Sequence, residues 1–395
     1  MRARHAWCMT PRSRNDADRA GGADIAIIGA GIVGASVAYW LTRLDPSASV
    51  ALIERDRTFA RASSALSASS IRQQFSHPLN IRMSQFGLGF LREMGIAVEE
   101  KGYLYLGAAG PLRALNELQR ANGADVALVT PAELSRRFPW LNVAGIELGS
   151  LGLGGEGWFD GPALHAEVLH RARAQGARLI EGEAQGFERE ADGRIRAVLL
   201  AGGSRIECGH AVNAAGPWAR SLAAAAAIAL PVHARRRTVF VLSCPDDLPG
   251  CPLVIDPSGF WFRPEGRYFI AGTTPNPDLD DLPLEPNHAE FDEALWSRMA
   301  HRVPAFAALR VERAWAGYYE MNLFDANAVI GAHPAAPNLW FANGFSGHGM
   351  QQAPAAGRGV AELILRGRFE TLDLEPLGFQ RLIDNRPMVE SIIIG

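Results

Sequence analysis

The stretch Asp24-Ile-Ala-Ile-Ile-Gly29-Ala-Gly31-Ile-Val-Gly34 decides the fold of this chain. An apolar strand runs into the pattern Gly-x-Gly-x-x-Gly, an apolar helix follows, and a second apolar strand ends in the acid Glu54. Gly29 permits a tight turn, Gly31 lets the backbone approach a pyrophosphate, and Gly34 lets the helix pack against the strand. The positive helix N-terminus then faces phosphates, and Glu54 is expected to accept hydrogen bonds from a ribose. The sequence therefore predicts a dinucleotide-binding fold.

Composition disfavours several other classes of function. With 395 residues, 48% of them hydrophobic, the chain can form two to three domain-sized units with a large core. The net charge of −3 gives no reason to expect nucleic acid or an anionic membrane as partner. Of the 39 basic residues only Lys101 is lysine, and no Gly-Lys-Ser/Thr phosphate loop exists. Nucleotide hydrolysis and pyridoxal chemistry are therefore not expected.

The cysteines and the apolar segments bear on compartment. The four cysteines form no Cys-x-x-Cys pair and have no histidine at zinc spacing, so no metal site is predicted and a reducing compartment fits. Residues 25–41 are uncharged, but they are too short and too rich in glycine for a membrane span. Residues 1–23 have no apolar signal core and are expected to be a disordered extension. We expect a cytoplasmic protein if the source is bacterial, with peripheral association with the inner membrane as an alternative. If the source is eukaryotic, we expect a mitochondrial matrix protein.

Two later segments repeat the order of strand, small-residue turn and helix, at Asn213-Ala-Ala-Gly216 and at Gly344-Phe-Ser-Gly347. Each suits close backbone approach to a ligand, although the first could be a simple helix-packing turn. Residues 230–320 instead read as antiparallel strands. We predict an α/β, Rossmann-like domain of the glutathione-reductase type, interleaved with an α+β antiparallel-sheet substrate domain. The expected boundaries are 24–77, 145–224 and 326–380 for the dinucleotide domain, 78–144 and 225–325 for the substrate or cap domain, and 381–395 for a C-terminal tail.

Together the motifs resemble the FAD-dependent D-amino acid oxidase superfamily, in its sarcosine oxidase and dimethylglycine dehydrogenase branch. The resemblance is carried by the Gly29 turn with Glu54-Arg55, the Ser63-Ser64 loop, Gly161-Pro-Ala-Leu164, Asn213 to Trp218, and Gly344 to Gly349. Within this superfamily the chain is most similar to mitochondrial flavoproteins associated with respiratory complex I assembly. This similarity rests on Ser69 to Ser76, Trp315 to Glu320, Phe324 to Asn327, and Gly347 to Pro354. The resemblance covers most of residues 24–375.

The resemblance implies a noncovalent FAD. Relatives that tether flavin through cysteine have that cysteine in the segment matching residues 316–319, where this chain has Gly317. Relatives that tether flavin through histidine have that histidine in the loop matching residues 63–70, where this chain has serine and alanine. The residues expected to bind the cofactor are Gly29, Gly31, Ile32, Val33, Gly34, Glu54, Arg55, Ser63, Ser64, Ser70, Ile71, Ala184, Ala215, Gly216, Trp218, Gly344, Ser346, Gly347, His348, Gly349, Met350 and Gln351.

The resemblance also implies oxidation of an amine, in which a hydride moves from the carbon beside nitrogen to flavin N5. Such a reaction requires a substrate fixed over the ring, and a guanidinium is well suited to hold its carboxylate. Arg72 is the expected clamp, although it could instead be a surface or phosphate-facing arginine. Tyr319 is the expected orienting side chain, with Tyr318 as its rival and core packing as the alternative for both. His348 is expected to contact flavin through its backbone, with a role as catalytic base the weaker reading.

Two further arginines and the missing lysine complete the interpretation. Arg263 and Arg267 lie on the sheet expected to roof the flavin, with structural salt bridges as their alternative. Oxidases of this branch use a lysine beside the flavin, where this chain has Phe269 and Gln351. We therefore expect a dehydrogenase that acts on an amino acid or N-alkyl amino acid and passes electrons to a quinone or carrier protein. The alternatives are a flavin-bearing assembly factor with little turnover and, less well supported, an NAD dehydrogenase.

Overall fold

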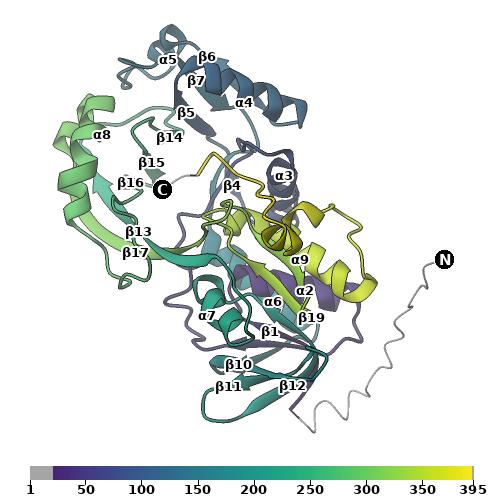
Figure 1. The fold of residues 1–395 in the computed structure, drawn as a ribbon. Helices are drawn as coiled ribbons and strands as arrows, with labels where there is room; N and C mark the ends of the chain where they lie inside the picture. Colours follow the sequence, from purple (N-terminus) through teal and green to yellow (C-terminus); the bar gives the residue numbers. More distant parts are fainter. Residues whose placement is uncertain (1–20, 394–395) are drawn as a thin grey trace.

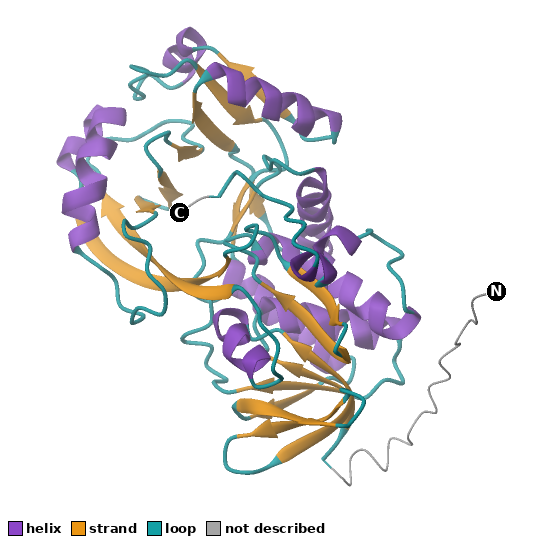
Figure 2. Cartoon of the chain, viewed as in Figure 1, coloured by secondary structure: helices purple, strands orange, loops and turns teal. Residues whose placement is uncertain are grey.

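A computed structural model describes residues 21–393 of the chain (Figure 1). Of the expected N-terminal extension, residues 1–20 lie outside the described residues. Two β-sheets organise the rest, one in the lower and one in the upper part of Figure 1, and Figure 2 shows helices on the outer faces of both. The interleaving of two domains expected from the sequence is confirmed.

The first sheet forms around the glycine-rich stretch. Within residues 21–393 it has eight strands, in which β12, β1, β2 and β9 run parallel, β19 adds in parallel to β12, and β10, β11 and β18 are antiparallel additions. The strands are β1 (Ala23–Ile28), β2 (Val50–Glu54), β9 (Arg178–Glu181), β10 (Ala184–Arg189), β11 (Ile195–Leu200), β12 (Arg205–Asn213), β18 (Val329–His333) and β19 (Ala336–Asn343). β1 is almost entirely buried, as its unbroken apolar run requires in a sheet covered on both faces.

Helices cover both faces of this sheet. One face carries α2 (Ile32–Leu44), α6 (Gly161–Ala174) and α9 (Gly349–Arg366), and the other carries α7 (Ala219–Ala224). Residues 32–42 of α2 are buried around the whole helix, because α2 lies between the sheet, α6 and α9. A Cβ atom on Gly357 of α9 would lie 2.6 Å from the backbone of Ser36, so only glycine allows this close packing.

The second sheet forms the core of the upper half of the molecule in Figure 1. Within the described residues its order is β17-β13-β16-β15-β14-β5-β7-β6. These strands are β5 (Tyr103–Gly107), β6 (Val126–Val129), β7 (Leu148–Gly152), β13 (Val232–Ser243), β14 (Leu253–Ile255), β15 (Phe260–Glu265), β16 (Tyr268–Thr273) and β17 (Arg310–Asn322). Around them lie α4 (Ala109–Ala121), α5 (Pro131–Arg137) and α8 (Trp296–Arg302), and a small sheet joins β3 (Ser70–Ile71), β8 (Gly157–Phe159) and β4 (Val98–Glu99).

Two elements lie across the expected boundaries. α3 (Pro78–Glu93), placed by the sequence at the start of the substrate domain, packs against α9 and shares the core of the first sheet. β7, placed by the sequence in the dinucleotide domain, pairs with β5 and β6 of the second sheet. Helix α9 begins at Gly349 and contains Pro354. After α10 (Gln380–Ile383) the chain returns toward the space between the sheets (Figure 1).

Candidate cofactor and substrate site

An elongated cavity of about 460 Å³ lies between the two sheets. It runs from the Gly29 turn and Glu54, past the serine loop 63–70, to Arg72 and Tyr319. Its volume lies within the usual range for a small-molecule site. Of the expected cofactor residues, Gly34, Ile71, Gly344 and Ser346 are behind its wall, and the others line it.

The Gly29 turn is fixed from three directions. Gly29 has a φ of +94°, and a Cβ atom there would lie 2.4 Å from the carbonyl oxygen of Ala214. The N–H of Ala30 donates to Glu54 Oε2 at 2.9 Å, and the Nε2 atom of His165 lies 2.7 Å from the Ala30 carbonyl oxygen. Because a carbonyl oxygen only accepts, His165 donates there, and burial lowers its pKa so that the ring stays neutral. The peptide of Ala30 is thus held at both of its polar atoms.

Glu54 has a structural role that the sequence did not indicate. Besides Ala30, it accepts a hydrogen bond from the N–H of Asp56 at 3.0 Å, through Oε1. Each carboxylate oxygen can accept a further bond, so the expected contact with a ribose remains available to this cavity-lining side chain.

Two helix N-termini open into the cavity. α2 begins after Gly31 and α9 after His348, and neither has a side-chain cap or an acid in its first turn. Ile32 and Val33 of α2 and Met350 of α9 line the cavity at these ends. Uncapped N–H groups at a helix start attract phosphates and other electron-rich oxygens. Gly31 fits this role, because a Cβ atom there would meet only Ser64 Oγ within 4 Å and would otherwise enter the cavity.

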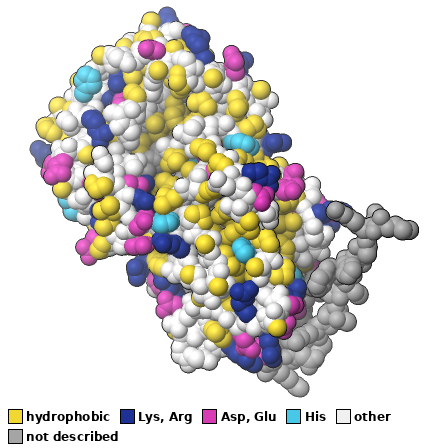
Figure 3. Space-filling model, viewed as in Figure 1, with side chains coloured by type: hydrophobic (Ala, Val, Ile, Leu, Met, Phe, Trp, Pro, Cys, Tyr) yellow, Lys and Arg dark blue, Asp and Glu magenta, His cyan; other side chains and the backbone are white. Residues whose placement is uncertain are grey.

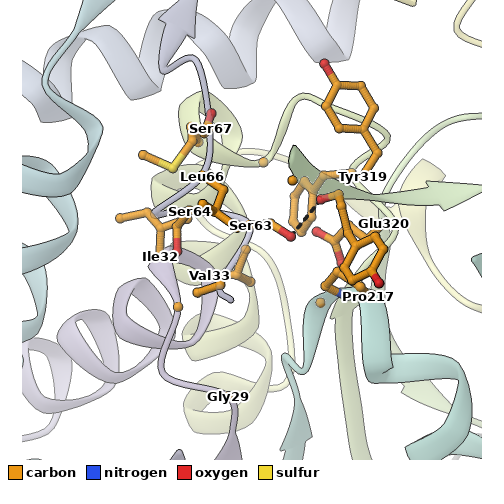
Figure 4. A pocket seen from close by; sticks show the side chains of 18 of the residues that line it. Gly29, Ile32, Val33, Ser63, Ser64, Leu66, Ser67, Pro217, Tyr319 and Glu320 are labelled. Carbon is orange, nitrogen blue, oxygen red and sulfur yellow. Dashed lines mark hydrogen bonds between the residues drawn. The ribbon is translucent and has the colours of Figure 1, made fainter. Parts of the chain in front are cut away.

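The serine loop and β17 face each other across the cavity. Figure 4 shows Ser63 and Ser64 on one side and Tyr319 and Glu320 on the other. The Ser63 hydroxyl donates to the Tyr318 carbonyl oxygen at 2.7 Å and so ties the loop to the strand. Farther along the cavity, the Arg55 guanidinium stacks 3.6 Å above the Trp218 ring.

Arg72 lies at the far end of the cavity and is only 1% exposed. Its guanidinium donates to the Gln74 carbonyl oxygen, to the Ile392 carbonyl oxygen at 2.6 Å and to His348 Nε2 at 2.8 Å. It also stacks 3.9 Å from the centre of the Phe75 ring. Within the described residues all three of these acceptors are uncharged, because burial and the nearby Arg72 charge hold the pKa of His348 well below its ordinary value.

Tyr319 and its neighbours form the wall beside Arg72. The Tyr319 ring packs against Gly347, where a Cβ atom would lie 2.5 Å from the ring, and the Arg237 guanidinium lies 5.1 Å from the ring centre. Arg237 makes a bidentate ion pair with Asp278 at 2.7 and 3.0 Å. Tyr318, the rival of Tyr319, also lines the cavity, and its hydroxyl donates to the Leu282 carbonyl oxygen at 2.6 Å.

The other two arginines considered from the sequence do not line this cavity. Arg263 is buried, with an ion pair to Glu265 at 2.5 Å and a hydrogen bond to the Ala68 carbonyl oxygen at 2.8 Å. Arg267 contacts Tyr268 at an exposed turn. Sequence reasoning missed His165, Arg237, Glu320 and Ile392. Arg237, for example, is brought to the wall by the pairing of β13 with β17, which sets it opposite Gly317, and no local sequence pattern marks that contact.

Glu320 is the most unusual ionisable group in the wall. It is buried, and its Oε2 accepts a hydrogen bond from the N–H of Gly344 at 3.0 Å. Burial raises its pKa to about 7, against the opposing effect of backbone hydrogen bonds from Gly344 and Phe345. A carboxyl group that changes charge near neutral pH therefore lines the cavity.

The DAO family model, described as FAD dependent oxidoreductase, matches residues 24–363. The chain belongs to this family. A relative from Xenopus laevis, "FAD-dependent oxidoreductase domain-containing protein 1", is 41% identical over 94% of this chain and 85% of its own length. Glycine oxidase of Geobacillus kaustophilus is 26% identical over 91% of this chain and 97% of its own.

A solved structure of similar fold is L-proline dehydrogenase from P. horikoshii. It matches with a TM-score of 0.82 and 27% identity over 93% of this chain and 99% of that one. This DAO family member is therefore an FAD-dependent oxidoreductase related to amino acid oxidases and dehydrogenases. The Gly31 opening and the two uncapped helix N-termini are features that an FAD could occupy, so the residues present fit the family's cofactor.

Two observations concern other ligands and surfaces. In residues 21–393, no group of three or more His, Cys, Asp or Glu side chains is arranged to hold a metal ion, and no helix is both long and apolar enough to cross a membrane. On the face drawn in Figure 3, basic and acidic side chains of the described residues are interspersed.

Proposed function

We propose that this family member oxidises the carbon–nitrogen bond of a small amino acid or N-alkyl amino acid and works as a dehydrogenase. The observation that carries the proposal is the buried Arg72 guanidinium in the cavity wall, held by neutral acceptors. A buried cation of this kind gains most from an anionic partner, and a carboxylate can accept a charge-assisted hydrogen bond from the guanidinium.

FAD, when bound, supplies the acceptor for the hydride. The protein's own part is to bind and orient. Arg72 would hold the carboxylate, the neutral His348 would keep Arg72 in place, and Tyr319 would border the substrate beside Arg72. Fixing the carboxylate at one end limits the positions that the reacting carbon can take, which is how orientation lowers the barrier.

Three side chains support a dehydrogenase. Gln351 lines the cavity, and its Oε1 is engaged by the N–H of Arg72 and the hydroxyl of Ser84, each at 2.9 Å. Phe269 is buried in the core of the second sheet. Lys101, the only lysine of the sequence, is exposed and does not line the cavity. No ammonium group of a described residue would thus be available to stabilise negative charge developing on oxygen. The electron acceptor we propose is a quinone or a carrier protein.

The test is anaerobic bleaching of the bound flavin by a panel of amino acids, N-methyl amino acids and 2-hydroxy acids. We expect the amino acids or their N-methyl derivatives to bleach the flavin of the unaltered protein, and Arg72→Met to require much higher concentrations. Arg267→Met is the matched control, because this exposed arginine lies away from the cavity. Bleaching by 2-hydroxy acids alone would contradict the substrate class, and absence of bleaching by every compound would favour a flavin-binding protein with little turnover.

A further inference from the structure

We propose that the C-terminal segment Met388–Ile392 supports the substrate site from behind its wall and positions Arg72 for the carboxylate. The inference rests on the proposed function of Arg72. Its first observation is the hydrogen bond from Arg72 Nη2 to the Ile392 carbonyl oxygen at 2.6 Å, between residues 320 positions apart in sequence.

Glu390 fixes the end of this segment. It is 1% exposed, and its Oε1 accepts hydrogen bonds from the N–H and the hydroxyl of Ser76 at 2.9 and 2.6 Å. Its Oε2 accepts from the amide of Asn80 at 2.9 Å. Oε1 also accepts from the N–H of Ile392 at 3.0 Å, so the same carboxylate that anchors the segment to α3 sets the position of the residue that contacts Arg72.

A second anchor lies one step back along the chain. The carbonyl oxygen of Asp325 accepts from the N–H of Glu390, and its Oδ2 accepts from the N–H of Met388, each at 3.1 Å. Asp325 is itself buried in an ion pair with Arg381 at 2.7 Å. Backbone groups held at two sites by buried carboxylates make this segment a built wall rather than a loose end.

The chemistry of the contact suits a carboxylate receptor. A carbonyl oxygen orients a guanidinium through a hydrogen bond but leaves its positive charge uncompensated. The nearest carboxylate of the segment, on Glu390, is turned to Ser76 and Asn80 instead. The Ile392 side chain packs against an apolar cluster that includes Tyr103, Leu253 and Trp261, and these three residues line the cavity. The segment therefore both aims Arg72 and backs the cavity wall beside it.

The test measures carboxylate binding in the FAD-loaded protein. Benzoate is the probe and benzamide its uncharged counterpart, each followed by the change in the visible flavin spectrum. We expect a chain ending at Met388 to keep its FAD and its benzamide affinity, while the Kd for benzoate rises about tenfold, the scale of one hydrogen bond to a charged group. Glu390→Ala in the full chain should show the same selective loss, which guards against a truncation that does not fold. Ile383→Ala is the control, because this residue is exposed and precedes the segment.

Two results would overturn the inference. Unchanged benzoate binding in both variants would mean that Arg72 needs no help from the segment, and tighter binding would mean that the Ile392 carbonyl competes with the substrate. Failure of the proposed function itself looks different. In that case the unaltered chain would bind benzoate no better than benzamide, or Arg72→Met would bind benzoate as well as the unaltered chain.

Discussion

The Nε2 atom of His348 accepts a hydrogen bond from Arg72 Nη2 at 2.8 Å, because a guanidinium has no acceptor. The lone pair that a catalytic base would use is therefore engaged, and burial beside Arg72 holds the pKa of His348 well below its ordinary value. In the proposed site the imidazole would act on the substrate through Arg72, and this geometry does not favour the alternative role as a catalytic base.

Replacing Arg72 by methionine should weaken the binding of carboxylate substrates by about 2 to 5 kcal/mol, the range for truncating one partner of a buried hydrogen-bonded charge pair. The measurement is KM for a carboxylate substrate and for its amide. Equal effects on both substrates would show that the loss is general packing at this buried site.

The glycines of the first turn should separate cofactor binding from folding. Gly31→Ala should leave the free energy of unfolding of the FAD-free protein nearly unchanged, because its Cβ atom would meet only the Ser64 hydroxyl oxygen, at 3.3 Å, and that side chain can rotate away, but FAD retention should fall sharply. Gly34→Ala should destabilise the fold itself, since its Cβ atom would lie 1.9 Å from the Gly29 carbonyl oxygen. Flavin content and urea unfolding distinguish the two. A Gly31→Ala protein with normal flavin content would place the pyrophosphate elsewhere.

FAD should be released completely by acid precipitation. The segment at Gly317 and the loop from Ser63 to Ser70 contain neither cysteine nor histidine, so neither position expected for a tether can form one. The supernatant and the pellet are compared by absorbance at flavin wavelengths. Yellow colour that stays with the washed pellet would contradict noncovalent binding of the FAD.

Reduced flavin should react slowly with air and quickly with an artificial quinone or dye. The neutral Gln351 lines the cavity where a lysine is expected in oxidase relatives, so developing negative charge on oxygen has no ammonium beside it. Peroxide formation and dye reduction are measured in parallel with the same substrate. Comparable rates would refute the dehydrogenase assignment.

Glu320 should make the FAD-free protein less stable as pH rises from about 4.5 to about 7. Its pKa is raised to about 7 in the folded state, so between these values the folded chain binds more protons than the unfolded chain, and the free energy of unfolding falls with rising pH. Thermal unfolding at several pH values checks this. Glu320→Gln should flatten that part of the profile, whereas an identical slope in both proteins would mean that Glu320 ionises normally.

The fold was largely predictable because its signals are local. A short window of sequence is enough to predict the Gly29 turn, each apolar strand and the turn at Gly344. The placement of α3 and β7 was not predictable in this way, because the face that each buries is chosen by partners far away in sequence.

The same limit applies to the site. The cofactor side follows from glycines whose spacing carries the information, and Arg72 follows from its place after the serine loop. Arg237 and Glu320 enter the cavity wall through the pairing of β13 with β17, and Ile392 reaches Arg72 behind that wall only because the chain returns there after α10. No composition or periodicity marks such contacts beforehand.

The pairing of β13 with β17 limits how this molecule can be divided into fragments. β17 pairs with β13 of the second sheet over its whole length, and at Glu320 and Asn322 it is also hydrogen-bonded to Gly344 and Ser346 beside the start of α9. The same continuous backbone thus serves both halves. Neither half can be expressed as an independent fragment with its half of the cavity intact, and transplanting the substrate sheet from a relative would also replace part of the flavin wall.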